Sequence, residues 1–148
     1  MAAELPANFT IVTLGVIDLD RSVSFYRSLG WEQRGDPAEG ILWFRTSGTW
    51  LGLYGYEPLA DDVGLPAGSA ADLPAYRGIT LALNFGSEAE VDAAFEQVAD
   101  VGADIVKPPT RADWGGYSGY FADPDGNLWE IAFAPSFPVD PNGRIEIT

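Results

Sequence analysis

The chain contains no histidine and no cysteine. Without cysteine there is no disulfide, no thiolate nucleophile, and no zinc–thiolate or iron–sulfur site. Without histidine there is no imidazole base, no serine–histidine–aspartate triad and no histidine-ligated metal. Any metal would need a site built entirely from oxygen ligands.

Basic residues are also scarce, because 8 lysines and arginines stand against 22 acids and give a formal net charge of -14. This charge repels phosphate backbones, so we expect no nucleic-acid partner. No apolar run approaches the roughly 20 residues that span a membrane, and the N-terminus has neither a basic start nor an apolar signal core. We therefore expect no membrane partner and a cytoplasmic protein.

The residues that are present favour one domain of 148 residues, with 47% hydrophobic residues and a high aromatic content. Residues 8–56 and residues 77–135 show the same order of predicted elements: strand, helix, strand, strand, strand. Each predicted helix starts after a capping residue and ends at a glycine. The predicted strands are 9–16, 31–34, 41–46, 49–54, 79–85, 103–107, 118–122 and 127–133, and the helices lie between Asp18 and Gly30 and between Ser87 and Gly102.

Two segments lie outside these modules. Residues 57–76 are rich in proline, alanine, glycine and aspartate, and we interpret them as a linker with a short helix near residues 59–63. A flap over a pocket is the alternative, and the two readings are compatible. Residues 136–148 form a proline-containing tail that we expect to be extended, either free or along a neighbouring chain. Pro108 and Pro109 are expected to end the strand before them.

Two runs of residues resemble one known family. The run from Leu14 to Trp31 is similar to the first strand and helix of the vicinal-oxygen-chelate superfamily, and the run from Gly119 to Glu130 is similar to its closing hairpin. This superfamily includes glyoxalases, extradiol dioxygenases, and bleomycin- and fosfomycin-resistance proteins. The resemblance covers residues 9–135. It implies an α+β fold of two paired βαβββ modules, whose sheets curl into a cup with helices outside, and a homodimer.

The resemblance also implies where a metal would be bound. In metal-using members the ligands come from the first and last strands of each module, and the matching positions here are Ile11, Gly52, Thr80 and Glu130. Only Glu130 is a suitable ligand, and a divalent cation needs several anionic or imidazole ligands. We therefore expect no metal and no cofactor.

Strand alternation indicates which side chains line the cup, because successive side chains point to opposite faces. If Ile11 takes a ligand position, Thr13 shares its face, and the bulky aliphatic residues between them face the helices. Trp31 and Trp43 are expected in the core or an interface. The predicted ligand-binding residues are Thr13, Trp50, Tyr54, Thr80, Asn84, Trp114, Tyr117, Tyr120 and Glu130.

Glu130 is the candidate catalytic residue, either as a general base or as the partner of a cationic ligand group. The alternative is a structural carboxylate that hydrogen-bonds a tyrosine or the backbone at the cavity wall. Arg45 and Arg77 are candidate internal partners for it. The segment from Trp114 to Tyr120 is the second candidate, because its glycines allow aromatic rings to approach a ligand. The alternative is that these rings cover the end of the core.

Three functions fit these observations. The first is a metal-independent protein that binds and sequesters an aromatic or cationic natural product or drug, as bleomycin-resistance proteins do in the family that it resembles. The second is an enzyme, a lyase, isomerase or dioxygenase, that uses Glu130 with a tyrosine as acid and base, or a metal bound elsewhere. The third is an accessory protein with a vestigial cup. The fold alone does not choose between them.

Overall fold

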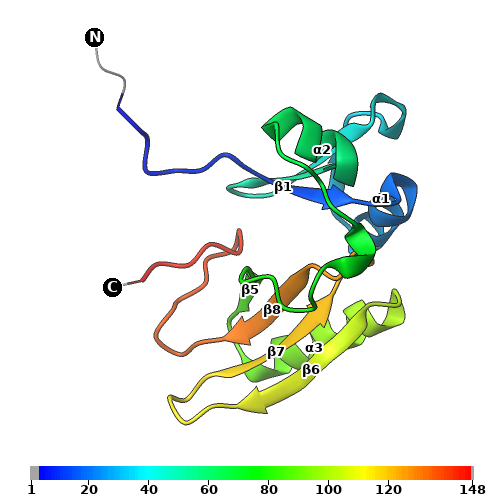
Figure 1. Ribbon diagram of the computed structural model, residues 1–148. Helices are drawn as coiled ribbons and strands as arrows, with labels where there is room; N and C mark the ends of the chain where they lie inside the picture. The colour runs from blue at the N-terminus through cyan, green and yellow to red at the C-terminus, as the bar shows by residue number, and fades with distance from the viewer. Residues whose placement is uncertain (1–3, 148) are drawn as a thin grey trace.

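The computed structural model describes residues 4–147, which form two four-stranded sheets and three α-helices (Figure 1). In the first module, sheet A has the strand order β1-β4-β3-β2. Its β1 and β4 are parallel, and the other neighbours are antiparallel. The elements of this module are β1 (Ile11–Val16), α1 (Leu19–Ser28), β2 (Glu32–Arg34), a 3₁₀ turn (Pro37–Glu39), β3 (Ile41–Arg45) and β4 (Trp50–Gly55).

The second module repeats this topology as sheet B, in the order β5-β8-β7-β6, with β5 and β8 parallel. The prediction of two paired βαβββ modules is confirmed. Between the modules lie α2 (Tyr56–Val63) and a 3₁₀ turn (Ala70–Asp72). The elements of the second module are β5 (Leu81–Phe85), α3 (Glu88–Asp100), β6 (Asp104–Arg111), β7 (Tyr117–Ala122) and β8 (Leu128–Phe133).

Local signals place the two long helices. The Asp18 carboxylate accepts a hydrogen bond from the Arg21 amide before α1, and the Ser87 hydroxyl accepts one from the Glu90 amide before α3. Each helix ends near a glycine with positive φ, as Gly30 shows at 86°. Both helices bury one apolar side against the sheet of their own module.

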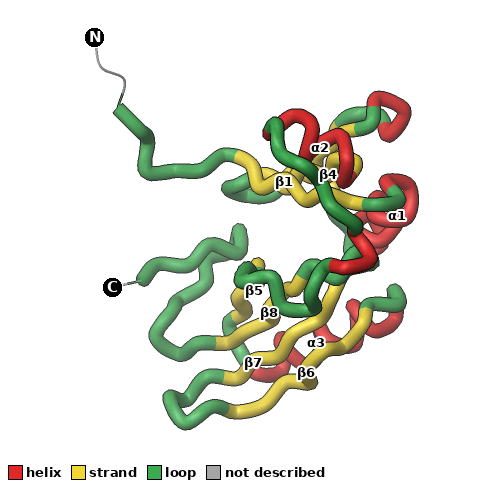
Figure 2. The backbone as a smooth tube through the Cα atoms, viewed as in Figure 1, coloured by secondary structure: helices red, strands yellow, loops and turns green. Residues whose placement is uncertain are grey.

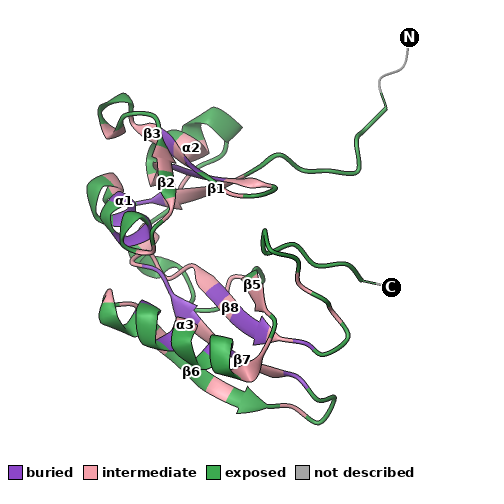
Figure 3. Ribbon diagram, turned by 180° about the vertical axis from the view of Figure 1, so that it is seen from behind, coloured by how far each residue is buried: buried purple, intermediate pink, exposed green. Residues whose placement is uncertain are grey.

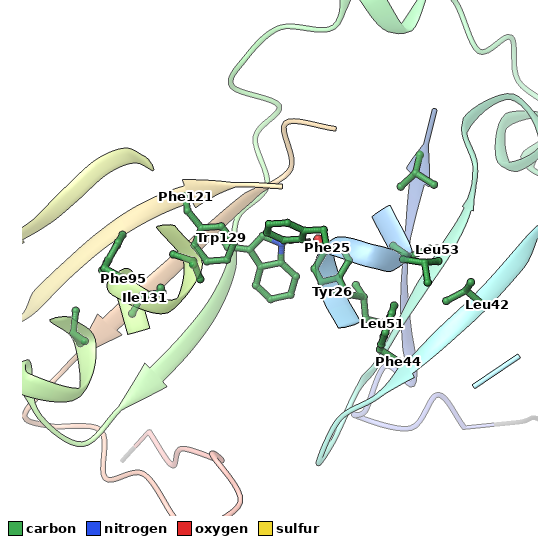
Figure 4. Close-up of a cluster of buried hydrophobic side chains, with 14 residues drawn as sticks. Phe25, Tyr26, Leu42, Phe44, Leu51, Leu53, Phe95, Phe121, Trp129 and Ile131 are labelled. Atoms are coloured by element: carbon green, nitrogen blue, oxygen red, sulfur yellow. Dashed lines mark hydrogen bonds between the residues drawn. The ribbon is translucent and has the colours of Figure 1, made fainter. Parts of the chain in front are cut away.

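One hydrophobic core runs through both modules (Figure 4). Leu42, Phe44, Leu51 and Leu53 of sheet A are 0–3% exposed and pack beneath α1. Helix α1 lies between the sheets, and its aromatic side chains reach Trp129 of sheet B (Figure 4). The core is therefore shared, which argues for one folding unit.

Sheets A and B do not close onto each other. Helix α2 lies on the opposite side of sheet A from α1 (Figure 1). It packs closely against β1 there, because a Cβ at Gly15 would lie 3.3 Å from the Tyr56 ring. Helix α3 covers one side of sheet B (Figure 3) and leaves the other side open. We call the side of each sheet away from α1 or α3 its open face. In sheet A, α2 covers the part of this face around Gly15. The two open faces point in different directions in the single chain (Figures 1 and 3).

Two expectations are corrected by the structure. Strand β6 does not end at Pro108 and Pro109 but continues to Arg111, with register shifts around the prolines. The strand tolerates them because it is the outer strand of sheet B and bonds to β7 alone, so the missing N–H groups break no second ladder. The tail is not simply extended. Val139 and Ile145 pair as an antiparallel bridge, and the tail turns back toward the first module (Figure 2).

Within residues 4–147, the structure has no helix with the length and apolar character needed to cross a membrane.

Candidate functional site

The open face of sheet A carries two of the predicted aromatic lining residues, Trp50 and Tyr54. Strand register places Ile11 beside Trp50, Thr13 beside Gly52 and Gly15 beside Tyr54. These side chains point away from the buried row of Leu51 and Leu53, as strand alternation predicts. The rings of Trp50 and Tyr54 are half-buried and offer flat apolar surface for a planar molecule.

Trp43 belongs to the same face, although the sequence analysis assigned it to the core or an interface. It pairs with Gly52 in the sheet, whereas its neighbours Leu42 and Phe44 are fully buried on the helix side. The sequence could have predicted this placement. Side chains alternate along β3, and Leu42 and Phe44 already face the core, so Trp43 between them must face the other way. Trp43 therefore joins Trp50 and Tyr54 on the open face.

A side chain at position 52 would be crowded by three neighbouring side chains. A Cβ at Gly52 would lie 3.0 Å from the Thr13 hydroxyl, 3.3 Å from the Ile11 side chain and 3.3 Å from the Trp43 ring. The backbone geometry of Gly52 is ordinary, so crowding rather than dihedral strain restricts this position. Any functional group on this part of the face must come from the neighbouring residues.

The open face of sheet B carries a hydrogen-bonded acid and phenol. Tyr120 on β7 and Glu130 on β8 are direct cross-strand partners, and the Tyr120 hydroxyl donates to Glu130 Oε2 at 3.0 Å. Both side chains are half-buried. Burial, followed by the hydrogen bond to Glu130, raises the pKa of Tyr120 above its ordinary value of 10.0. Tyr120 is thus a protonated donor at neutral pH.

Thr80 and Asn84 lie on the strand next to this pair. Asn84 is the sheet partner of Ala132, two residues after Glu130 on β8, and is half-buried. Thr80 precedes β5 and is exposed. By register, both belong to the same face as Glu130. The structure therefore brings Tyr120, Glu130 and Asn84 together, with Thr80 at the edge.

Tyr117 and Trp114 lie elsewhere. Tyr117 pairs with Phe133 on the α3 side of sheet B, and its hydroxyl donates to Asp92 of α3 at 2.6 Å. This hydrogen bond is the main reason that the pKa of Tyr117 is raised. Trp114 is 63% exposed in the β6–β7 turn. Neither ring contributes to the Tyr120–Glu130 pair.

Neither candidate arginine pairs with Glu130. Arg45 lies 4.0 Å from the Glu32 carboxylate on the exposed edge of sheet A. Arg77 donates to the Asp125 carbonyl at 2.8 Å and to the Asn127 side chain at 3.3 Å. The carboxylate of Glu130 has Tyr120 as its side-chain hydrogen-bond partner, and its remaining acceptor capacity is open to a ligand.

The four positions that the resemblance assigns to metal ligands do not fit a divalent cation. Ile11 and Gly52 offer no donor atom, and Thr80 offers a neutral hydroxyl beside the one carboxylate of Glu130. Within the described part of the chain, no three acidic, histidine or cysteine side chains are grouped closely enough to hold a metal ion. Crowding at Gly52 also prevents a substitution there from supplying the missing ligand without rearrangement.

Two pockets lie apart from the aromatic rings of sheet A and from the Tyr120–Glu130 pair. A cavity of about 90 Å³ lies beneath the linker, lined by Leu14, Arg77, Ile79 and Leu81 among others. A groove of about 580 Å³ lies between α1 and the turn that precedes β8, with Arg21, Phe25 and Asp104 in its wall. Neither pocket contains Trp50, Tyr54, Tyr120 or Glu130.

Comparisons with known proteins agree with this fold. Metallothiol transferase FosB of Shouchella clausii is 31% identical over 121 residues, which cover 81% of this chain and 75% of that protein. The structure of a glyoxalase-related enzyme from Fulvimarina pelagi is similar with a TM-score of 0.83 and 30% identity, covering 97% of this chain and 99% of that one.

More distant structures share the fold. Lactoylglutathione lyase from Agrobacterium tumefaciens has a TM-score of 0.65 and 23% identity, over 88% of this chain and 96% of that one. Residues 9–131 match the model of one family, and this range includes every predicted site residue. The chain belongs to the glyoxalase/bleomycin resistance protein/dioxygenase superfamily.

Proposed function

We propose that this protein binds a small aromatic or cationic organic molecule on its open faces without the help of a metal. The observation that carries the proposal is the Tyr120–Glu130 hydrogen bond, on a face where Glu130 is the one anionic group at the family's metal positions. A carboxylate held beside a phenol suits an ammonium group or a hydrogen-bond donor. The rings of Trp43, Trp50 and Tyr54 suit a flat apolar body.

This proposal separates the protein from relatives that work through a metal. The name of the Shouchella protein implies a metal and a thiol in its reaction. Here the corresponding positions hold Ile11 and Thr80, which cannot replace strong ligands. Sequestration of a natural product or drug requires a stacking surface, one charge pair and an enclosed shape. The open faces supply aromatic rings and the Glu130 carboxylate, and the enclosure would come from the second copy proposed below. A cytoplasmic setting is part of the proposal, since a chain without cysteine has no need of an oxidising compartment.

A homodimer is the second part of the proposal. The open faces of one chain do not face each other, so a second copy is needed to enclose a ligand between two sheets. The edges of the sheets support this assembly. Each sheet has two edge strands. At one edge, β2 of sheet A has only three residues and β6 of sheet B carries two prolines, which discourages pairing with another chain. The opposite edge strands, β1 and β5, have no such features. Phe9 and Ile79 are each 69% exposed beside these two strands.

The proposal is tested by metal analysis combined with a ligand screen. Purified protein is analysed for divalent metals, then screened by thermal shift against aromatic amines before and after chelation. We expect a metal content well below one per chain and ligand-induced stabilisation that survives chelation. A stoichiometric, tightly held divalent metal, or stabilisation that disappears on chelation, would overturn the proposal.

An enzyme is the alternative, and the same pair of residues favours it. Glu130 and Tyr120 are close enough for proton transfer between them or to a shared substrate. In this case Glu130 is the catalytic residue and Tyr120 the proton donor. Turnover of a ligand found in the screen, with loss of turnover but retained affinity in Glu130→Gln, would establish catalysis. Retained turnover in Glu130→Gln would remove this role.

A further inference from the structure

The two modules are connected noncovalently on two different sides of the molecule. On one side, α1 binds the turn before β8. The Tyr26 hydroxyl donates to Asp123 at 2.6 Å, and the Ser22 hydroxyl donates to Asp125 at 2.8 Å. Tyr26, Ser22 and Asp123 are 0–4% exposed. This contact, which we call the hinge contact, is buried and fully hydrogen-bonded.

The second connection is made by the C-terminal tail. Residues 139–145, which we call the strap, form a tight hairpin. Asp140 accepts hydrogen bonds from the amides of Asn142 and Arg144, and Gly143 has a φ of 79°. The Val139–Ile145 bridge closes the hairpin. The strap thus has a defined shape of its own, although it contains few residues.

Arg144 joins the strap to the first module. Its guanidinium donates through Nε at 3.0 Å and through Nη2 to the carbonyl of Ser47, in the turn between β3 and β4. That turn is held to the start of β1, because the Thr49 hydroxyl donates to the Phe9 carbonyl at 2.8 Å. The strap therefore reaches sheet A from the end of sheet B, on the side of the chain away from α1 (Figures 1 and 2).

The two connections differ in strength. The hinge contact is buried with the aromatic core, and breaking it would expose apolar surface and unpaired polar groups. Arg144 and Ser47 are both exposed, and water can replace hydrogen bonds between exposed groups at little cost. Local opening takes place first where few buried contacts must be broken.

We propose that the strap is a releasable latch that sets the angle between the two modules through Arg144, with the hinge contact as the fixed pivot. When the latch opens, the modules rotate about α1 and the turn before β8. Because each open face belongs to one module, this angle sets how the two faces are presented to a ligand or to a second copy. Arg144 is then a positioning residue: its guanidinium binds Ser47 and neither the aromatic rings of sheet A nor the Tyr120–Glu130 pair.

Distances between pairs of spin labels test this proposal, and the absence of native cysteine makes the labelling specific. One pair, Gly48→Cys with Asp113→Cys, spans the two modules on the strap side. A second pair, Glu39→Cys with Asp100→Cys, spans them on the α1 side. All four positions are exposed, and a side chain at Gly48 meets no atom within 4 Å.

We expect a narrow distance distribution for both pairs in the intact chain. Arg144→Gln should at least double the width of the strap-side distribution and leave the α1-side distribution unchanged. Arg144→Lys, which keeps the charge and loses the two-pronged contact, should give an intermediate width. Arg27→Gln is the matched control, because it removes an exposed arginine from α1 without touching the strap.

Two results would overturn the proposal. The first is an unchanged strap-side width in Arg144→Gln and in a chain ending at Ala134, which would show that the strap does not restrain the modules. The second is equal broadening of both label pairs, which would show general loosening rather than rotation about the hinge contact. Circular dichroism of each variant verifies that the modules remain folded.

Discussion

The hydroxyl of Tyr26 lies 2.6 Å from a carboxylate oxygen of Asp123, across 97 residues of sequence. Tyr26 is on α1 of the first module, and Asp123 begins the turn that leads into β8 of the second. The same hydroxyl accepts a hydrogen bond from the indole of Trp129 at 3.0 Å. One buried phenol thus joins a helix of one module to a strand and a turn of the other.

Removing this hydroxyl should destabilise the protein. In Tyr26→Phe, the Trp129 indole N–H loses its buried acceptor and Asp123 loses one of its donors, which costs about 1–3 kcal/mol for unpaired buried groups. The free energy of unfolding from urea titration measures this loss. Tyr56→Phe is a suitable control, since its hydroxyl bonds to a carbonyl in the linker. Equal stabilities of Tyr26→Phe and the unchanged protein would contradict this role.

Alkaline pH should destabilise the protein through the same group. Burial, followed by the nearby charge of Asp123, raises the pKa of Tyr26 well above its ordinary value of 10.0. Below pH 10 the phenol is neutral in both states, and its contribution to stability is complete. Above pH 10 the unfolded chain releases the proton and the folded chain retains it, so stability falls by about 1.4 kcal/mol per pH unit. Urea titrations at several pH values should show a shallower decline in Tyr26→Phe.

Introducing two metal ligands should create a metal site at the positions that the family resemblance assigns. Ile11→His combined with Thr80→His would place two imidazoles at the family's ligand positions with Glu130, a donor set that suits zinc. We expect about one zinc ion per chain in competition with a chromophoric chelator, and weaker binding by each single variant. Because Ile11 and Glu130 lie on different open faces, zinc binding would also show that the two faces meet in the assembled protein. No gain over the natural chain would contradict the assignment of these positions.

Charge at the exposed edge should weaken the proposed dimer. Ile79 is 69% exposed just before β5, and Ile79→Lys would place like charges near the interface of two copies. Light scattering over a range of concentrations should show a shift toward monomer. Val106→Lys is the matched control, because Val106 is 52% exposed on the outer strand β6. Equal oligomeric states for both variants would contradict an interface at β5.

The helices and strands could be predicted from the sequence where capping residues and glycines agree with the spacing of the hydrophobic residues. Asp18 and Gly30 mark the limits of α1, and the alternation of Leu51 and Leu53 identifies the buried face of β4. The same alternation places Thr13 and Glu130 on open faces. These features depend on residues close in sequence, so they do not require knowledge of the tertiary structure.

Other features depend on neighbours that the sequence does not reveal. Pro108 and Pro109 are compatible with β6 because that strand is at the edge of its sheet. Tyr117 turns to α3 because β7 begins at that residue and its register places the ring beside Phe133. The hairpin in the tail has a local signal, because Asp140-Pro141-Asn142-Gly143 resembles the turn that begins at Asp123. Its contact with Ser47 requires the tertiary arrangement.

Glu130 as the recognition group for a cation is the central claim, and one titration tests it most directly. Benzylamine and the neutral benzyl alcohol are titrated into chelator-treated protein and into Glu130→Gln, with tryptophan fluorescence as the signal. We predict that benzylamine binds without metal and about tenfold more weakly to Glu130→Gln, which corresponds to one charge-assisted hydrogen bond. Benzyl alcohol should bind both proteins equally. Absence of benzylamine binding to the natural chain, or equal affinities for both proteins, would contradict the account.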